Sequence, residues 1–562
     1  MEKIFKRFGI LLLLLASSCD LDGDLQNPNE ISVSGADVDL VMNAVQLDFA
    51  DFFNAASGGN ITGTTAFGVD ALVRMQAMTT GYRYQTADQA QYTDDLWTLA
   101  YQNVLINAET LIPLAESKNL TTHVAVAKIL KAYVYLTLVD LFGDVPQSEA
   151  LKAAEGNFNP AVDGGEEIYA YAIGLLGEAR TELAKTGTDA GGGLARDIYY
   201  GGNRDKWNAL ANTLELKAWL NISMISTRTA EANTRINVLL GDDLIDTEEE
   251  NFTYKYGTVT NPVSRHPLYE QYYGPNEGSA SGYLANYYLY ELYNGKGVED
   301  PRWRYYFYRQ VGSLAQATAV DSKAIGCDAG AIPDHYANGG YIFCTFDPGF
   351  YGRDHGDASG TPPDGTVKTC VGVYPAGGQI DNTLTSNDTY WDPTIRGDGG
   401  NGEGIQPIFM SFFTDYMKAE ILARANDAGA KAQLATAIDN SITQVRKFAK
   451  NLGQELGPGR EPSTVDYQAA VATMFDNATN KLDVIGREYW VACWGNGIEA
   501  YNNYRRTSAP KDPQPTVRTN PGPFLRSLIY PSVYVNLNSS ATQKDVNATN
   551  KVFWDTNPDN LQ

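Results

Sequence analysis

The sequence has few of the residues that carry catalysis or bind metals in most enzymes. Its 562 residues include 5 cysteines and 4 histidines. The histidines are far apart in the sequence, and the cysteine spacing matches no zinc pattern. Neither G-x-S-x-G nor H-E-x-x-H occurs, so the common signatures of serine hydrolases and zinc proteases are missing. The sequence therefore indicates a protein that is not an enzyme.

Long apolar runs and an excess of positive charge are also lacking. After residue 18, no segment approaches the roughly 20 apolar residues that a membrane-spanning helix needs. The chain has 43 Lys and Arg against 67 Asp and Glu, for a formal net charge of −24. Such a chain repels phosphate backbones, so we expect no nucleic-acid partner.

The amino-terminal segment has the layout of an export signal. Residues 1–18 begin with basic residues, continue with an apolar run from Phe8 to Leu15 and end with small residues, which predicts a signal peptide. Cys19 follows in LASSC, which resembles a bacterial lipobox although Ala16 stands where a large apolar residue is usual. We expect lipidation of Cys19; a chance cysteine beside an ordinary cleavage site is the alternative. Acyl chains add about 0.8 kcal/mol per buried methylene, and the polar residues 19–35 predict a flexible tether.

Apolar residues recur at helical spacing in two parts of the chain. Between them the sequence is rich in Gly, Asp, Asn, Pro and Tyr, with one helix expected near residues 281–294. No Pro-rich linker divides the chain, so we expect one mainly α unit. Its parts are a helical-repeat half at 36–240, a loop-rich insertion at 241–405 that forms the ligand-binding half, and C-terminal helices with an extended tail at 406–562, packed with the first half.

Several segments, in their order along the chain, resemble one known family. They are AKILKAYVYLTLVDLFGDVPQSEAL at 127–151, KWNALANTLELKAWLNIS at 206–223, YGRDHGDASGTPPDG at 351–365 and WGNGIEAYNNYRRTSAP at 494–510. Together with Cys19 they resemble the SusD/RagB family of nutrient-binding outer-membrane lipoproteins. One departure is Lys131, where many relatives carry arginine. The resemblance covers almost the whole chain.

The resemblance implies a fold and a cellular role. The expected fold is a SusD-like right-handed superhelix of degenerate tetratricopeptide-type helical hairpins with a large loop-rich insertion. The expected location is the outer membrane, with the protein lipid-anchored and exposed at the cell surface. The expected partner is a SusC-like TonB-dependent transporter, which receives the bound ligand.

Aromatic residues are abundant, with 35 tyrosines and 8 tryptophans. A sugar ring has an apolar face and a rim of hydroxyls, so aromatic side chains flanked by polar groups suit it. Aromatic residues in loops are predicted to contact the ligand, with ordinary loop anchoring as the alternative: Tyr82, Tyr84, Tyr272, Tyr273, Tyr283, Tyr390 and Trp391. Aromatic residues at helical spacing are assigned to the core: Trp97, Tyr101, Tyr133, Trp207, Trp219, Trp490 and Trp494.

Two polar clusters allow more than one interpretation. Residues 353–357, RDHGD, could hold a metal or an acid/base pair, but such density of Asp, Gly and His is more typical of a hydrogen-bonded turn. Asp398, Asn401 and Glu403 are candidate ligands of a structural calcium ion, although their spacing lacks the EF-hand order. A flexible Gly-rich turn is the alternative, and no other cofactor is expected.

The remaining cysteines and two arginines have structural interpretations. A disulfide among Cys327, Cys344 and Cys370 is plausible in an exported protein, with the pairing left open. Cys493, in an apolar helix, is predicted to be a buried thiol. Arg505 and Arg506 are predicted to hold the C-terminal segment by hydrogen bonds.

These observations predict a surface lipoprotein that binds an oligosaccharide or polysaccharide and passes it to its transporter. A peptide-binding, RagB-like member of the family is one alternative, since an aromatic loop pocket can also hold an extended chain. A surface-anchored glycoside hydrolase is the alternative from another class. It would need two carboxylates roughly 5 to 10 Å apart, which 67 acidic residues do not by themselves indicate.

Overall fold

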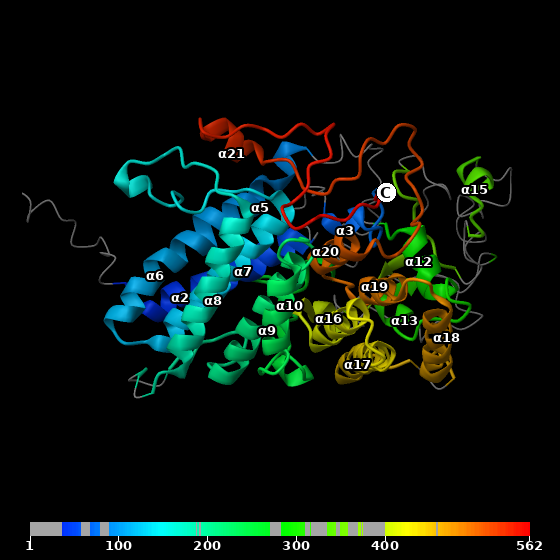
Figure 1. Cartoon of the computed structure of the whole chain (residues 1–562). Coiled ribbons are helices and arrows are strands. Elements are labelled where there is room, and N and C mark those ends of the chain that lie inside the picture. The colour runs from blue at the N-terminus through cyan, green and yellow to red at the C-terminus, as the bar shows by residue number, and fades with distance from the viewer. Residues whose placement is uncertain are drawn as a thin grey trace, which may run out of the picture.

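Figure 1 shows a computed structural model of the chain, in which helices form most of the molecule. It describes residues 36–57, 68–78, 89–186, 188–189, 193–269, 283–309, 315, 334–343, 349–357, 369–372, 374, 400–456 and 459–562. The signal peptide, Cys19 and the tether thus lie outside the described residues. The helices of the first part of the chain lie at the left of Figure 1, and those of the later parts lie at the centre and right.

The helices of the first half form where the apolar periodicity predicts them. They are α2 (Val38–Ser57), α3 (Val69–Leu72), α5 (Asp94–Thr98), α6 (Ile106–Ser117), α7 (Thr121–Phe142), α8 (Gly165–Ala184), α9 (Arg204–Ile222) and α10 (Thr229–Leu239). The segment 94–117, expected as one helix, contains a π-helical stretch at Leu99–Leu105 between α5 and α6. Neighbouring helices pack as successive pairs, with α8 against α7 and α10 against α9.

Helix α7 is the central element of this half. It contacts α2, α6, α8, α9 and α20. All its residues except Lys128 are buried, so it is covered on every side rather than on the single face that the periodicity suggested. The helix ends at Phe142 because Gly143 adopts a φ of +74°, which a residue with a side chain rarely adopts. The predicted glycine stop is confirmed.

The insertion is closed at its base by a two-stranded antiparallel ribbon. Strand β1 (Phe252–Tyr256) opens it and pairs with β4 (Gly404–Phe409), which closes it. Between them lie α12 (Asn286–Tyr293), α13 (Trp303–Tyr306), β2 (Phe307–Arg309), α15 (Asp334–Gly339) and β3 (Thr369–Val371). Strand β2 pairs antiparallel with β3. The prediction of short strands and a helix near 281–294 is confirmed, with α12 starting at Asn286.

The C-terminal helices are α16 (Ser411–Arg424), α17 (Ala430–Asn451), α18 (Thr464–Asn477), α19 (Lys481–Ala492), α20 (Gly497–Thr507) and α21 (Ser532–Leu537). Residues 482–506, expected as one helical segment, form two helices. The break has a physical cause in the sequence, because Gly495 adopts a φ of +85° and the side chain of Asn496 caps α20 by accepting from the N–H of Glu499.

One continuous apolar core joins the first half to the C-terminal helices. The tail crosses the top of Figure 1 and returns to α7. The N–H of Leu528 donates to the carbonyl of Leu141 (2.8 Å), and the indole N–H of Trp554 donates to Asp140 (3.0 Å). The tail therefore packs as part of the unit.

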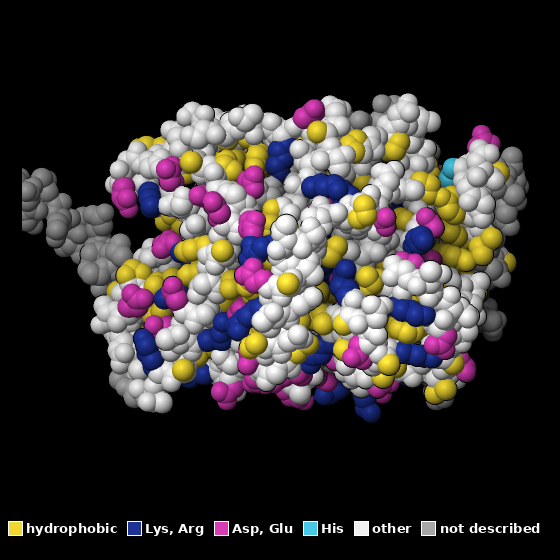
Figure 2. Space-filling model, viewed as in Figure 1, with side chains coloured by type: hydrophobic (Ala, Val, Ile, Leu, Met, Phe, Trp, Pro, Cys, Tyr) yellow, Lys and Arg dark blue, Asp and Glu magenta, His cyan; other side chains and the backbone are white. Residues whose placement is uncertain are grey.

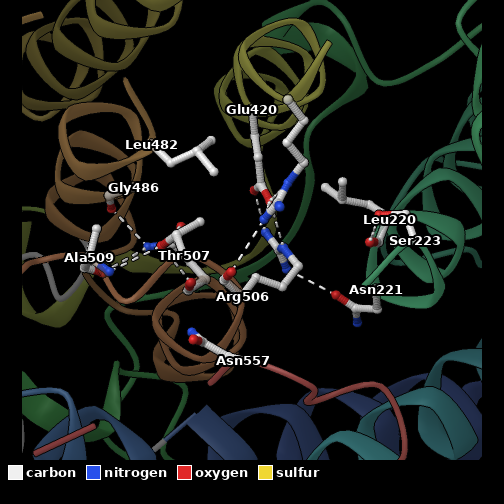
Figure 3. Close-up of polar contacts among 12 residues, drawn as sticks. Leu220, Asn221, Ser223, Glu420, Leu482, Gly486, Arg506, Thr507, Ala509 and Asn557 are labelled. Carbon is white, nitrogen blue, oxygen red and sulfur yellow. Dashed lines mark hydrogen bonds and ion pairs between the residues drawn. The ribbon is translucent and has the colours of Figure 1, made fainter. Parts of the chain in front are cut away.

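A buried ion pair joins three helices at the centre of the molecule (Figure 3). Arg506 of α20 donates two hydrogen bonds to Glu420 of α16, at 3.1 and 2.9 Å, and a third to Asn221 of α9 at 3.0 Å. Although burial raises the pKa of Glu420, Arg506 and then Arg424 lower it further, to about 2. Both partners of the pair are therefore charged near neutral pH.

The two adjacent arginines have different roles. Arg505 donates to the carbonyl oxygens of Arg526 in the tail (2.8 Å) and of Asp140 in α7 (2.7 Å). The prediction that Arg505 holds the C-terminal segment is confirmed. For Arg506 it is wrong, because its guanidinium holds α16 and α9 instead. In the described part of the chain, no helix is both long and apolar enough to cross a membrane.

Candidate ligand-binding site

Three short segments from distant parts of the sequence are joined by backbone hydrogen bonds. The N–H of Ala77 donates to the carbonyl of Tyr283 (2.8 Å), and the N–H of Arg353 donates to the carbonyl of Leu284 (2.9 Å). A further bond links Gly356 to Met78 (2.9 Å). We call these segments the anchor ribbon: residues 75–78, 283–286 and 352–356.

Six of the seven aromatic residues predicted to contact a ligand lie outside the described residues: Tyr82, Tyr84, Tyr272, Tyr273, Tyr390 and Trp391. Four of these belong to segments that the anchor ribbon bounds, since residues 79–88 follow Met78 and residues 270–282 precede Tyr283. Tyr390 and Trp391 belong instead to the segment between Tyr374 and residue 400. The flanking residues therefore divide the predicted aromatic residues into two groups, and their contact with a ligand stays a prediction.

Tyr283 is the one predicted aromatic residue that the structure describes. It is 3% exposed, and the guanidinium of Arg353 lies over its ring at 4.0 Å from the centroid. The ring thus packs within the anchor ribbon as a cation–π partner. Its contact with a ligand stays a prediction.

The cluster Arg353-Asp354-His355-Gly356-Asp357 forms a turn. The N–H of Asp357 donates to the carbonyl of Asp354 (3.1 Å), and Gly356 adopts a φ of +80°. The fully buried carboxylate of Asp354 accepts from Tyr336 (2.7 Å) and Asn286 (2.9 Å), and pairs with His335 (2.8 Å). The interpretation as a hydrogen-bonded turn is confirmed, and the Asp354 carboxylate links α12 and α15 to the anchor ribbon.

A small polar cavity lies beside the anchor ribbon. Its volume is about 30 Å³, which exceeds the roughly 10–15 Å³ that a single water requires. It is lined by the end of α2, by α3, by β4 and by residues next to the ribbon: Asn54, Ser57, Asp70, Met75, Gln76, His266, Leu268, Gln406, Trp494 and Gly495. Three of these elements adjoin segments 58–67, 79–88 and 270–282. The cavity is therefore placed at the base of the predicted ligand-contacting segments.

Several buried polar atoms on the cavity wall have no hydrogen-bond partner. They are Oδ1 of Asn54, Oγ of Ser57, Nε2 of His266 and Nε1 of Trp494. Buried polar atoms in native proteins nearly always have a protein or water partner. An acceptor, a hydroxyl and two ring nitrogens around one small space suit a hydroxyl group or a water molecule.

Burial sets the charges around this cavity. Burial raises the pKa of Asp70 to about 7, opposed by the N–H groups of Ala71 and of Asp70 itself and by Gln76. Burial also lowers the pKa of His266 to about 3, partly offset by the carbonyl of Ile405. The imidazole is therefore neutral near pH 7, and the cavity wall holds no fixed positive charge from His266.

A larger groove runs along the other face of the β1–β4 ribbon. Its volume is about 510 Å³, within the range of about 300–1,000 Å³ that is typical of ligand sites. Side chains from four parts of the sequence line it: Tyr199, Tyr200, Lys206, Glu248, Glu249, Asn251, Thr253, Lys255, Tyr256, Tyr374, Glu403, Gly404, Ile405, Met410, Gln444, Phe448, Asn451 and Leu452. Tyr374 and Glu403, which flank the segment of Tyr390 and Trp391, are among them. We call this hollow the ribbon groove.

A third hollow, of about 390 Å³, lies between α12, α18 and α19. Its aromatic wall includes Tyr290 and Phe343, whose rings stack at 4.5 Å. Figure 2 shows hydrophobic side chains gathered on this side of the molecule, near the positions of α12 and α18. Arg487 and Glu291, which also line it, are bound to each other as an ion pair.

The predicted calcium and disulfide sites stay predictions. Asp398 lies outside the described residues, whereas Asn401 and Glu403 are exposed. Among the residues that the structure describes, no group of three or more His, Cys, Asp or Glu is placed to hold a metal ion. Cys327 and Cys344 also lie outside the described part, and Cys370 is described only as part of β3. The prediction for Cys493 is confirmed, since it is a free, buried thiol.

The aromatic residues assigned to the core are buried, with one exception. Trp97, Tyr101, Tyr133, Trp207, Trp490 and Trp494 belong to the buried core. Trp219 is half-buried, with its indole N–H donating to Glu215 (3.1 Å). Trp494 differs from the others because it also lines the polar cavity.

The sequence interpretation missed the polar cavity and the ribbon groove. Asn54 and Ser57 carry a signal, since they are polar residues at buried positions near the end of an otherwise apolar helix. The groove residues have no such signal. They come from four segments between residues 199 and 452 that only the tertiary structure brings together.

Comparison with protein families gives one match over more than half of the chain. The model of the SusD-like family, described as starch-binding and associating with the outer membrane, matches residues 28–336. No curated protein matches this chain.

Solved structures of similar proteins match almost the whole chain. A chitin-binding SusD homologue from Flavobacterium johnsoniae matches with a TM-score of 0.62 and 18% identity, covering 92% of this chain and 99% of its own. A SusD/RagB family protein from Bacteroides thetaiotaomicron matches with a TM-score of 0.62 and 17% identity, covering 93% of this chain and 99% of its own. A further chitin-binding protein matches with a TM-score of 0.64 and 20% identity, covering 92% of this chain and all of its own. The predicted fold, mainly helical and of tetratricopeptide type, is confirmed.

Proposed function

Since this chain belongs to the SusD-like family, whose members associate with the outer membrane, we propose that it is a cell-surface lipoprotein that binds a nutrient glycan and delivers it to a SusC-like TonB-dependent transporter. Anchoring through an acylated Cys19 is part of this proposal. The protein binds its ligand without breaking a bond and is not an enzyme.

The observation that carries the proposal is the agreement in fold with a chitin-binding SusD homologue over almost the full length of both chains. The chemistry of the described residues supports it. The anchor ribbon bounds segments that carry four tyrosines, and the adjoining polar cavity offers acceptors and donors suited to a hydroxyl group. Aromatic rings and hydroxyl-binding groups are what a sugar ring requires.

The tether gives the proposed function its coupling to transport. A receptor held near the membrane by a lipid anchor and a flexible segment meets its transporter at a high effective concentration. Capture and delivery then need no tight intrinsic affinity between the two proteins.

The experiment is a binding screen of the purified body, residues 20–562, against neutral oligosaccharides and a peptide library. We expect binding to an oligosaccharide, with maltoheptaose and chitohexaose as the first probes. Binding should fall at least about tenfold in Tyr82→Ala, because an aromatic ring stacked on a sugar contributes about 0.5–1.5 kcal/mol beyond its buried area. The melting temperature should not change.

Three results would contradict the proposal. Binding to peptides alone would favour the RagB-like alternative. Steady release of new reducing ends from a polysaccharide would show a glycoside hydrolase. Unchanged affinity in both Tyr82→Ala and Trp391→Ala would remove those residues from the site.

A further inference from the structure

The β1–β4 ribbon separates two hollows of different character. Side chains alternate across a strand, so Thr253 and Lys255 lie on the opposite face from Tyr254. Gln406 of β4 lines the polar cavity, whereas its neighbour Ile405 lines the ribbon groove. The ribbon groove is therefore a separate site from the polar cavity and from the anchor ribbon.

The aromatic rings of the ribbon groove are held in place by the protein. The hydroxyl of Tyr200 donates to the carbonyl of Glu250 (2.6 Å), and its ring packs at 5.2 Å against Trp207. Tyr374, which is 1% exposed, lies edge-on to Phe448 at 5.7 Å. Because these rings are already fixed, a ligand that packs against them loses little side-chain entropy on binding.

The polar groups on the groove differ in how they are used. Asn251 and Gln444 are bound to each other at 2.9 Å, which fixes β1 against α17. In contrast, Thr253, Lys255 and Asn451 have side chains that bind no other described residue. They border the groove and keep their donors and acceptors available. Glu403, across the ribbon, is exposed in the same way.

The charges indicate a neutral ligand. Two lysines, Lys206 and Lys255, are balanced by three glutamates, Glu248, Glu249 and Glu403. A polyanion would meet the glutamates and a polycation the lysines, whereas a polyhydroxylated neutral chain can bind between them. Fixed aromatic rings beside free amide, hydroxyl and ammonium groups match a sugar chain.

We propose that the ribbon groove is a second binding site for a neutral oligosaccharide. The inference rests on the proposed glycan binding and adds a second point of contact with the same polymer. Two sites on one chain raise the avidity for a long polysaccharide, because the second contact becomes intramolecular after the first.

Titration calorimetry with the oligosaccharide that the array identifies, beginning with maltoheptaose and chitohexaose, tests the inference. We expect two sites per chain in the wild type. The triple variant Thr253→Ala, Lys255→Ala, Asn451→Ala removes three hydrogen-bonding groups and should weaken one site at least about tenfold. Asn451→Trp, which fills the groove, should abolish the same site, and both variants should melt with the wild type.

The matched control is Lys450→Ala, one residue from Asn451 on α17, with an exposed side chain that does not line the groove. It should leave both sites unchanged. Tyr82→Ala should lose the other site and keep the one in the groove. Two sites in the wild type with one lost in each groove variant would support the inference.

The possible failures are distinct. A single site that the groove variants leave unchanged, or a groove that binds peptides and no glycan, would overturn this inference and leave the proposed function intact. Absence of glycan binding by the wild type would overturn the proposed function, and the inference with it.

Discussion

Asp70 shows how one buried side chain makes stability depend on pH. Burial raises the pKa of its carboxyl group from 3.8 to about 7. Between about pH 4 and pH 7 the unfolded chain has lost the proton while the folded chain keeps it, so folding becomes less favourable as pH rises. The full shift corresponds to about 4 kcal/mol. Below pH 4 both states are protonated and the contribution is constant.

We therefore predict that Asp70→Asn raises the melting temperature relative to the wild type at pH 8 and leaves it nearly equal at pH 4.5. Asn keeps the shape of the side chain and an oxygen that can accept the 2.8 Å hydrogen bond from the N–H of Ala71. Thermal melting of both proteins at four pH values measures the difference. A difference that does not change with pH would show that Asp70 ionises normally in the folded protein.

At the scale of elements, the approach of α20 to α2 and α3 depends on one glycine. A Cβ on Gly497 would lie 2.5 Å from the carbonyl oxygen of Ser57 and 2.8 Å from the backbone N of Asp70. Backbone atoms cannot move aside as a flexible side chain can, so the helix would have to shift away from the wall of the polar cavity.

We predict that Gly497→Ala destabilises the fold by about 1–3 kcal/mol. The matched control is Gly174→Ala in α8, where an added Cβ would meet nothing within 4 Å and the side chain faces solvent. Because alanine is the better helix former, the control should stabilise the fold by about 0.5–1 kcal/mol. Denaturant unfolding of the three proteins compares them. Equal stability of Gly497→Ala and the wild type would contradict the close approach.

The same element-scale comparison shows where periodicity succeeds. Segments 38–56, 122–143 and 166–185 are helical within two residues at each end. Segments 94–117 and 482–506 were each expected to be continuous, but each is interrupted. A π-helical stretch leaves the apolar periodicity almost unchanged, and a glycine followed by asparagine also occurs within loops and at helix ends. Neither interruption is therefore strongly marked in the sequence.

For the whole molecule, the proposed role requires attachment to a membrane. We predict that cells expressing the full chain incorporate radiolabelled palmitate into the protein, and that Cys19→Ala abolishes both incorporation and recovery with the membrane fraction. The physical reason is that acyl chains contribute about 0.8 kcal/mol per buried methylene.

Cys493→Ala is the matched control for that experiment, because the Cys493 thiol is buried in the described structure. It should incorporate palmitate as the wild type does. Incorporation that persists in Cys19→Ala, or a mature chain that begins at a residue other than Cys19, would remove the proposed anchor.

The sequence by itself determined the mainly helical class, the order of helices and loop-rich insertion, and the family resemblance, because apolar periodicity and ordered motifs are local properties of the chain. It also determined that Cys493 and most helical aromatic residues are buried. Only the tertiary structure decided that Arg506 holds Glu420 and that the polar cavity lies against the anchor ribbon. It also decided that four distant segments form the ribbon groove. These features depend on contacts between residues up to hundreds of positions apart, which no local pattern encodes.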